Sequence, residues 1–186
     1  MFKEEKKQRL ADLYLPDKSP IGNVDERIKS LLDSINEIED YYTMSSCSGR
    51  TTLSKVKDSG KGLDWLFVSH DIVHFKDIEK IISNLPGGLV YFRYEGLILH
   101  TCAKDLESAQ RLMLLGQNNG CKYSSIISTK KRFVVEFIDM IRMDVPIAKD
   151  GKLLVDVDYL KFLIDEANKK LSLTHALIDR LELVIN

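Results

Sequence analysis

The feature of this sequence that most constrains its fold is a pair of apolar runs, Leu89–Tyr94 and Leu97–Cys102, separated only by Glu95-Gly96. Runs of this length, rich in aliphatic and aromatic residues, are typical of β-strands. The Glu95-Gly96 step is either a tight hairpin turn or a bulge within one long strand. A third run, Trp65–His70, is almost continuously apolar and predicts a strand in the middle of a sheet. The fold must therefore contain a β-sheet of several strands.

Helical spacing of apolar residues occurs before, between and after these strands. Residues 23–38 and Asp77–Asn84 each place apolar side chains on one helical face, and Asp105 is expected to cap a further helix. Residues 2–15 and 156–184 predict a short N-terminal helix and a long C-terminal helix. Helices that alternate irregularly with paired strands predict an α+β fold, with a mixed β-sheet covered by helices.

The length of 186 residues is sufficient for one well-buried domain or two small ones. We expect a single α+β domain over residues 1–186, made of N-terminal helices (1–40), a mixed sheet with helices (41–155) and a C-terminal helix (156–186). One pattern occurs twice: an apolar strand with a histidine near its end, followed by a helix that begins with aspartate. It spans 65–84 and again 97–116, and it predicts an internal strand–helix duplication.

The charge balance argues against a strongly basic nucleic-acid-binding domain, because 27 Lys+Arg face 28 Asp+Glu and the net charge is −1. Positive charge is nevertheless clustered, and the clusters form a phosphate-binding face if the fold brings them together; otherwise they are solvated surface charges. The clusters are Lys3, Lys6, Lys7 and Arg9; Lys55, Lys57 and Lys61; and Lys130, Lys131 and Arg132. The three dispersed cysteines and the lack of an apolar leader predict a reduced, cytoplasmic protein without a membrane anchor.

Familiar cofactor motifs are missing from the sequence. There is no Gly-x-Gly-x-x-Gly turn after a strand, no phosphate-binding Gly-Lys-Ser/Thr loop and no His-Glu-x-x-His pair. A conventional Rossmann methyltransferase or dehydrogenase is therefore not expected. Any chemistry must then use a different kind of site. The lack of a familiar cofactor motif is the best argument for the alternative, a non-enzymatic RNA-binding or scaffold protein.

The stretch Tyr41–Arg50 begins like a strand and then turns to small hydroxyl and thiol side chains, which predicts a tight loop. The hydroxyls of Ser45, Ser46 and Ser48 together with the Arg50 guanidinium suit an anion or a carboxylate. The alternative is an ordinary turn of small residues. Cys47 is either a nucleophile or, more simply, a small packed residue.

His70 and His100 each stand at the end of a predicted strand. Each is either a general base or a structural histidine. Trp65 either packs in the core or stacks on a base, and Glu95 either holds a ligand amine or is solvated. A metal site needs about three convergent ligands, which His70, His100 and Cys47 could supply. Their spacing follows no recognisable ligand pattern, so we expect no metal.

These residues resemble, in order and spacing along nearly the whole chain, the tRNA wybutosine-synthesizing protein 3 family. The resemblance is carried by Tyr42-Thr43-x-Ser45-Ser46-Cys47-Ser48-Gly49-Arg50, Lys61-Gly62-x-x-Trp65-Leu66-Phe67-Val68-Ser69-His70-Asp71, Glu95-Gly96-x-Ile98-Leu99-His100 and Asp105-Leu106-Glu107-Ser108-Ala109-Gln110, with further matches at Pro146, Tyr159-Leu160, Ala167-Asn168 and Arg180. Two positions depart from it: Ser125 stands where a glycine is usual, and Ile138 near an expected arginine.

The resemblance implies an S-adenosylmethionine-dependent methyltransferase that methylates N4 of a 4-demethylwyosine-type tricyclic base beside the anticodon of phenylalanine tRNA. For this activity, His70 or His100 would suit as the base. We expect the cofactor to be bound by Ser45, Ser46, Ser48, Arg50, Ser69 and Glu95, although the serines and Arg50 equally suit a tRNA phosphate. We expect the tRNA to be bound by Trp65, Lys61, Lys130, Lys131 and Arg132. We expect a monomer that acts on the anticodon loop.

Overall fold

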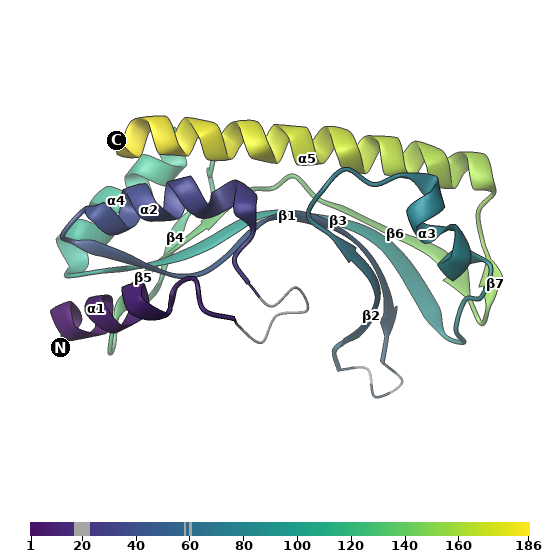
Figure 1. The fold of residues 1–186 in the computed structure, drawn as a ribbon, viewed down its shortest axis with the longest axis horizontal. Helices are drawn as coiled ribbons and strands as arrows, with labels where there is room; N and C mark the ends of the chain where they lie inside the picture. The colour runs from purple at the N-terminus through teal and green to yellow at the C-terminus, as the bar shows by residue number, and fades with distance from the viewer. Residues whose placement is uncertain (17–22, 58, 60) are drawn as a thin grey trace. The chain divides into compact units, whose positions relative to one another are not determined.

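The structure is a computed structural model that describes residues 1–16, 23–57, 59 and 61–186 (Figure 1). Its elements are α1 (Phe2–Asp12), the 3-10 helix η1 (Glu26–Ile28), α2 (Lys29–Glu37), β1 (Tyr41–Val56), β2 (Leu63–Ser69), α3 (Phe75–Ile82), β3 (Leu89–Ala103), α4 (Leu106–Asn118), β4 (Ser125–Ser128), β5 (Phe133–Ile138), β6 (Met143–Lys149), β7 (Lys152–Leu153) and α5 (Val157–Ile185).

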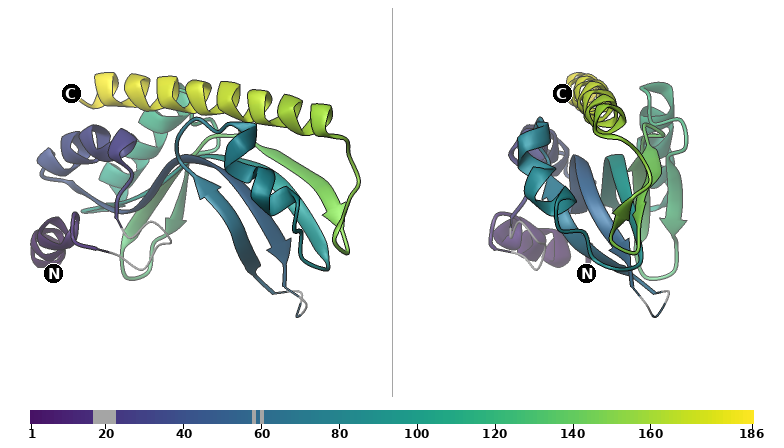
Figure 2. Two further views of the ribbon diagram at one scale, coloured as in Figure 1. Left: turned by 45° about the vertical axis from the view of Figure 1, so that its right-hand side comes forward. Right: turned by 90° about the vertical axis from the view of Figure 1, so that its right-hand side faces the viewer.

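The chain divides into two compact units. Unit 1 comprises Met1–Ser48, Leu97–Met140 and Thr174–Asn186, and unit 2 comprises Gly49–Gly96 and Ile141–Leu173. The long elements β1, β3 and α5 each contribute one part to unit 1 and the other to unit 2. Figures 1 and 2 show α5 as one unbroken helix. The expectation of a single domain over 1–186 stays a prediction.

Unit 1 is built around a core to which helices and strands both contribute. The fully buried residues of α2 pack with the second half of β3, with α4 and with the end of α5. Figure 1 shows α2 and α4 beside the C-terminal part of α5. The helical spacing of Ile28, Leu31, Leu32 and Ile35 predicted this apolar face, and all four are at most 1% exposed. Strand β5 pairs with this half of β3 on one side and with β4 on the other, both antiparallel.

Unit 2 has its own core, in which the first half of β3 and strand β6 pack against α3 and the first part of α5. Phe92 and Tyr94 of β3 are among its largest fully buried side chains. Antiparallel pairing joins β2 to the second half of β1, β6 to the first half of β3, and β7 to β6. Each unit thus buries its own apolar side chains between helix and sheet, which confirms the α+β class.

Two expectations about the sheet are corrected by the structure. Every strand pair with a resolved register is antiparallel, so the sheet is an open antiparallel one and not mixed. The strand order is β2-β1-β3-β5-β4, with β6 beside β3, which places β2 at an end of that path and not in the middle. The side chains of β2 are half-buried or exposed, since its apolar run has a partner strand on one side only among the described pairings.

Strands β1 and β3 each continue through a glycine at which the sequence had suggested a turn. Glu95 and Gly96 lie within the unbroken β3, so the long-strand alternative is correct and the hairpin is not. Residues Ser45–Arg50 likewise lie within β1 and form no tight loop. Gly49 has φ +97°, a backbone conformation that side-chain-bearing residues rarely adopt, and it lets the strand continue where the sequence predicted a turn.

The repeated strand–helix pattern is found once in each unit, as β2 followed by α3 and as the second half of β3 followed by α4. Asp105 caps α4 as expected, because its carboxylate accepts from the Ser108 N–H at 2.8 Å. Helix α3 differs: its N-cap is His74, and Asp77 completes a capping box from the third position. Among the described residues, no helix has the length and apolar character needed to cross a bilayer.

Candidate active-site residues

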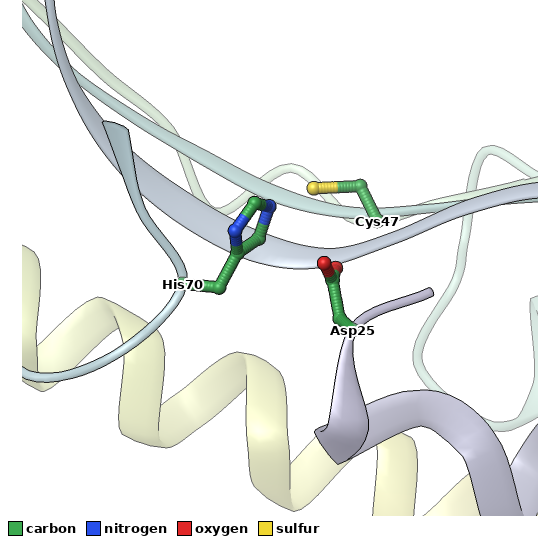
Figure 3. A group of neighbouring side chains, drawn as sticks. All are labelled: Asp25, Cys47 and His70. Atoms are coloured by element: carbon green, nitrogen blue, oxygen red, sulfur yellow. The ribbon is translucent and has the colours of Figure 1, made fainter. Parts of the chain in front are cut away.

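Strand β1 presents the serine-rich stretch as a strand, so alternate side chains point to opposite faces. Ser45 is exposed, Ser46 and Cys47 are half-buried, and Ser48 is completely buried. Ser48 is already engaged: its N–H and its hydroxyl both donate to Asp25 Oδ2, at 2.8 and 3.0 Å. Figure 3 shows the Asp25 carboxylate turned toward β1, near Cys47. Asp25 and Ser48 therefore fix the segment before α2 against the strand.

Ser45 belongs to a chain of hydrogen bonds across three neighbouring strands of unit 1. The hydroxyl of Ser45 on β1 lies 2.7 Å from His100 Nδ1 on β3. The other ring nitrogen, Nε2, lies 2.9 Å from Glu136 Oε1 on β5. His100 and Glu136 are directly opposite each other in the antiparallel register, which puts their side chains on one face of the sheet.

Arg50, Trp65 and Glu95 form a second group, within unit 2. The Nε of Arg50 donates to Glu95 Oε2 at 2.6 Å, and the guanidinium carbon lies 4.7 Å from the centre of the Trp65 ring. Trp65 is 38% exposed, so it is not a core residue. The part of the chain that the structure describes offers the terminal N–H groups of Arg50 no further hydrogen-bond acceptor. They are donors available to an anionic ligand.

His70 and Ser69 close strand β2. Ser69 Oγ accepts from the Asp71 N–H and donates to the Asp71 carbonyl, both at 3.1 Å, which makes a local turn just after the strand. His70 is the first residue after β2 and is half-buried (Figure 3). The fold thus places His70 after a strand end, as expected, whereas His100 lies inside β3.

The basic turn between β4 and β5 borders a pocket of about 610 Å³ in unit 1. The pocket is lined by Met1, Glu5, Lys130, Lys131 and Arg132. The carboxylate Glu5 Oε2 accepts from Arg132 Nε at 2.9 Å and from the Tyr42 hydroxyl at 2.8 Å, and the pKa of Glu5 is lowered chiefly by the arginine. No ion pair is found for either lysine within the described ranges, so both ammonium groups are open to a phosphate. Lys61 is an exposed cation of unit 2.

Sequence reasoning found most of these side chains but missed Glu136, Asp25 as the partner of Ser48, and Glu5. The signal for Glu136 was present: it is the single charged residue in the apolar strand Phe133–Ile138. The sequence could not show its partner, because that depends on which strand pairs with β5 and in which register. The predicted absence of a metal stays a prediction.

The fold is therefore an α+β one with an open antiparallel sheet, outside the Rossmann class. It carries a histidine hydrogen-bonded to a carboxylate and a pocket lined by basic side chains. Comparison with known proteins sharpens this description. The family Methyltransferase TYW3 matches residues 4–186. The chain belongs to this family, and membership favours the enzyme over the scaffold protein.

Two curated relatives have the printed name tRNA(Phe) 7-((3-amino-3-carboxypropyl)-4-demethylwyosine(37)-N(4))-methyltransferase. The one from Methanocaldococcus jannaschii is 38% identical over 96% of this chain and 94% of its own. The one from Thermococcus sibiricus is 38% identical over 97% of this chain and 92% of its own. The solved PH1069 protein of Pyrococcus horikoshii superimposes with a TM-score of 0.88 at 35% identity, and the match covers 100% of this chain and 96% of that one.

Proposed function

We propose that this protein is an S-adenosylmethionine-dependent tRNA methyltransferase that methylates N4 of a 4-demethylwyosine-type tricyclic base next to the anticodon of phenylalanine tRNA. The observation that carries the proposal is the match to Methyltransferase TYW3 from residue 4 to residue 186. It is supported by relatives with that activity in their names, which the match covers to 94% and 92% of their length. The names also suggest a base that already bears an aminocarboxypropyl group as the substrate.

The side chains of unit 2 suit S-adenosylmethionine chemically. This cofactor ends in an amino acid, with one carboxylate and one ammonium group, and carries an aromatic base at the other end. Arg50 has terminal donors for the carboxylate, and Glu95 has a carboxylate oxygen for the ammonium. Ser69 is a further hydroxyl partner from unit 2 in the proposal. The exposed ring of Trp65 offers a stacking face for an adenine or for a tRNA base.

The tRNA contacts in the proposal are electrostatic and sequence-independent. Lys130 and Lys131 beside the pocket of unit 1, with Arg132 and with Lys61 of unit 2, neutralise phosphates of the anticodon loop. Bases of an RNA loop are recognised by stacking and by contacts to their edges, because they are not held in a duplex. We expect the protein to act as a monomer in the cytoplasm.

Methylation of a ring nitrogen needs alignment and the removal of one proton. S-adenosylmethionine, when bound, supplies a methyl group whose carbon–sulfur bond breaks with its electron pair going to sulfur. The protein's part is to orient the accepting nitrogen, which is the largest source of rate in such a transfer, and to take its proton. His100 and His70 are the proposed proton acceptors. His100 has the better-defined setting, because both of its ring nitrogens have partners in unit 1.

The test is methylation of phenylalanine tRNA purified from a strain that lacks this gene. The purified protein and S-adenosylmethionine are added, and the nucleosides are then separated and weighed by mass spectrometry. We expect the tricyclic nucleoside to gain the mass of one methyl group, with fragmentation that places it on N4. A matched reaction with a tRNA that carries no tricyclic base is expected to incorporate none. An unchanged nucleoside profile would contradict the proposal.

A further inference from the structure

Ser45, His100 and Glu136 stand in one row across three adjacent strands, β1, β3 and β5. All three belong to unit 1. Ser45 is exposed at the open end of the row, whereas the side chains of His100 and Glu136 are 26% and 23% exposed. The row therefore runs from solvent at the serine to a half-buried carboxylate.

The hydrogen bonds of this row determine which nitrogen of His100 carries the proton. An ionised carboxylate can only accept, so the bond to Glu136 requires a proton on Nε2. In the neutral ring, Nδ1 then has a free lone pair and accepts the Ser45 hydroxyl proton. Glu136 thus fixes both the tautomer and the orientation of the imidazole, and Ser45 Oγ is left with a lone pair that faces solvent.

We propose that Ser45, His100 and Glu136 are a proton relay for the methyl transfer, with Ser45 contacting the substrate nitrogen and Glu136 as a positioning residue. The inference rests on the proposed function. It gives Ser45 a role in proton transfer, whereas the sequence led us to expect Ser45 to bind the cofactor. It also adds Glu136, which no sequence motif indicated.

The relay balances in protons and electrons. As the nitrogen acquires its methyl group, its N–H proton passes to Ser45 Oγ, and the bonding electron pair stays on nitrogen. The Ser45 hydroxyl proton passes at the same time to His100 Nδ1, which makes an imidazolium stabilised by the Glu136 carboxylate. His100 returns the proton to solvent through Ser45 after product leaves. The same order of groups activates the serine nucleophile of hydrolases, but transfer of a methyl group to nitrogen needs no protein nucleophile.

The first measurement needs neither cofactor nor tRNA. In nitrogen-15-labelled protein, the ring nitrogens of His100 are assigned by comparison with His100→Gln. The wild type is expected to show the tautomer with its proton on Nε2. Glu136→Ala is expected to lose that preference, whereas Glu107→Ala, which removes an exposed glutamate of helix α4, leaves it unchanged. A proton on Nδ1 in the wild type would overturn the relay.

The second measurement is the single-turnover rate of methyl transfer. Ser45→Ala and Glu136→Ala are each expected to slow it on the order of 10²-fold or more, with cofactor and tRNA dissociation constants unchanged. Glu136→Gln keeps an acceptor oxygen for Nε2 but removes the charge, and it is expected to be intermediate. Ser34→Ala, at a half-buried serine of helix α2, is the matched control with the wild-type rate.

These measurements distinguish failure of the relay from failure of the proposed function. A wild-type protein that transfers no methyl group to the tricyclic base contradicts the proposed function and the relay together. A wild-type protein that is active, with Ser45→Ala or Glu136→Ala equally fast, contradicts the relay alone. Weaker cofactor binding by Ser45→Ala at an unchanged single-turnover rate would also overturn the relay and return Ser45 to the cofactor.

Discussion

Replacement of Arg50 is the sharpest test of the ligand-binding group in unit 2. Its guanidinium is held by Glu95 at 2.6 Å and by the Trp65 ring at 4.7 Å, so its terminal donors are pre-oriented. Hydrogen bonds to charged groups contribute about 1.5–3 kcal/mol, and we therefore expect Arg50→Ala to weaken ligand binding roughly 10- to 150-fold. Arg50→Lys keeps the charge but loses the planar fork and is expected to lie between.

The same replacement removes an ion pair and a cation–π contact from the free protein. Because Arg50 and Glu95 are 28% and 40% exposed, the pair is worth about 0.2–1 kcal/mol, and the contact with the partly exposed Trp65 about 0.5–1 kcal/mol. The free energy of unfolding should fall by about 0.7–2 kcal/mol in a urea titration followed by circular dichroism. Ligand affinity is measured by calorimetry, since Trp65 is the sole tryptophan and its emission changes with the mutation.

Unit 2 contains a matched control for this experiment. Arg93 also stacks on an aromatic ring, 4.5 Å from the centre of Tyr91, and its Nε also donates to a carboxylate, Asp144, at 2.8 Å. Arg93→Ala is expected to cost similar stability without loss of ligand affinity. If Arg50→Ala binds both S-adenosylmethionine and tRNA within twofold of the wild type, Arg50 is not a ligand-binding residue.

Three further predictions concern charge and thiols. Single replacement of Lys130 or Lys131 by alanine should weaken tRNA binding and reduce the slope of log K against log salt by about 1, measured by filter binding at several salt concentrations; an unchanged slope would remove that lysine from the phosphate contacts. The Lys104 ammonium, 3.0 Å from the Asp40 carboxylate, lowers the pKa of Asp40 below its ordinary 3.8. The ionised Asp40 therefore stabilises the folded protein above that pH, and this stabilisation is lost as the pH falls through the pKa that Asp40 has in the folded protein. Thermal melts between about pH 5 and pH 3 should therefore drop more steeply for the wild type than for Asp40→Asn, and parallel curves would count against the contact. Cys121 is 0% exposed, and its burial raises the pKa of its thiol to about 12. A thiol reagent at neutral pH should therefore label Cys121 only in denaturant, as measured by peptide mass spectrometry. Labelling in the folded protein would show that the core of unit 1 opens.

Local pattern was sufficient for most elements of this fold. The apolar spacing along η1 and α2 predicted four of the side chains that the core of unit 1 buries: Ile28, Leu31, Leu32 and Ile35. Asp105 predicted the start of α4 because a cap is a contact between near neighbours, here three residues apart. The strand at Trp65 was also found, but its place in the sheet was wrong, since an apolar run does not reveal how many partner strands a segment has.

The sequence by itself therefore determined the α+β class, the position of most helices and strands, and the family through the motifs around Ser45, Trp65 and His100. Only the tertiary structure decided what those motif residues contact. Ser45, His100 and Glu136 are 55 and 36 residues apart in the chain, and they meet because three strands pair in one particular order. A shift of β5 by one residue would turn Glu136 to the opposite face of the sheet, so the strand register makes the contact.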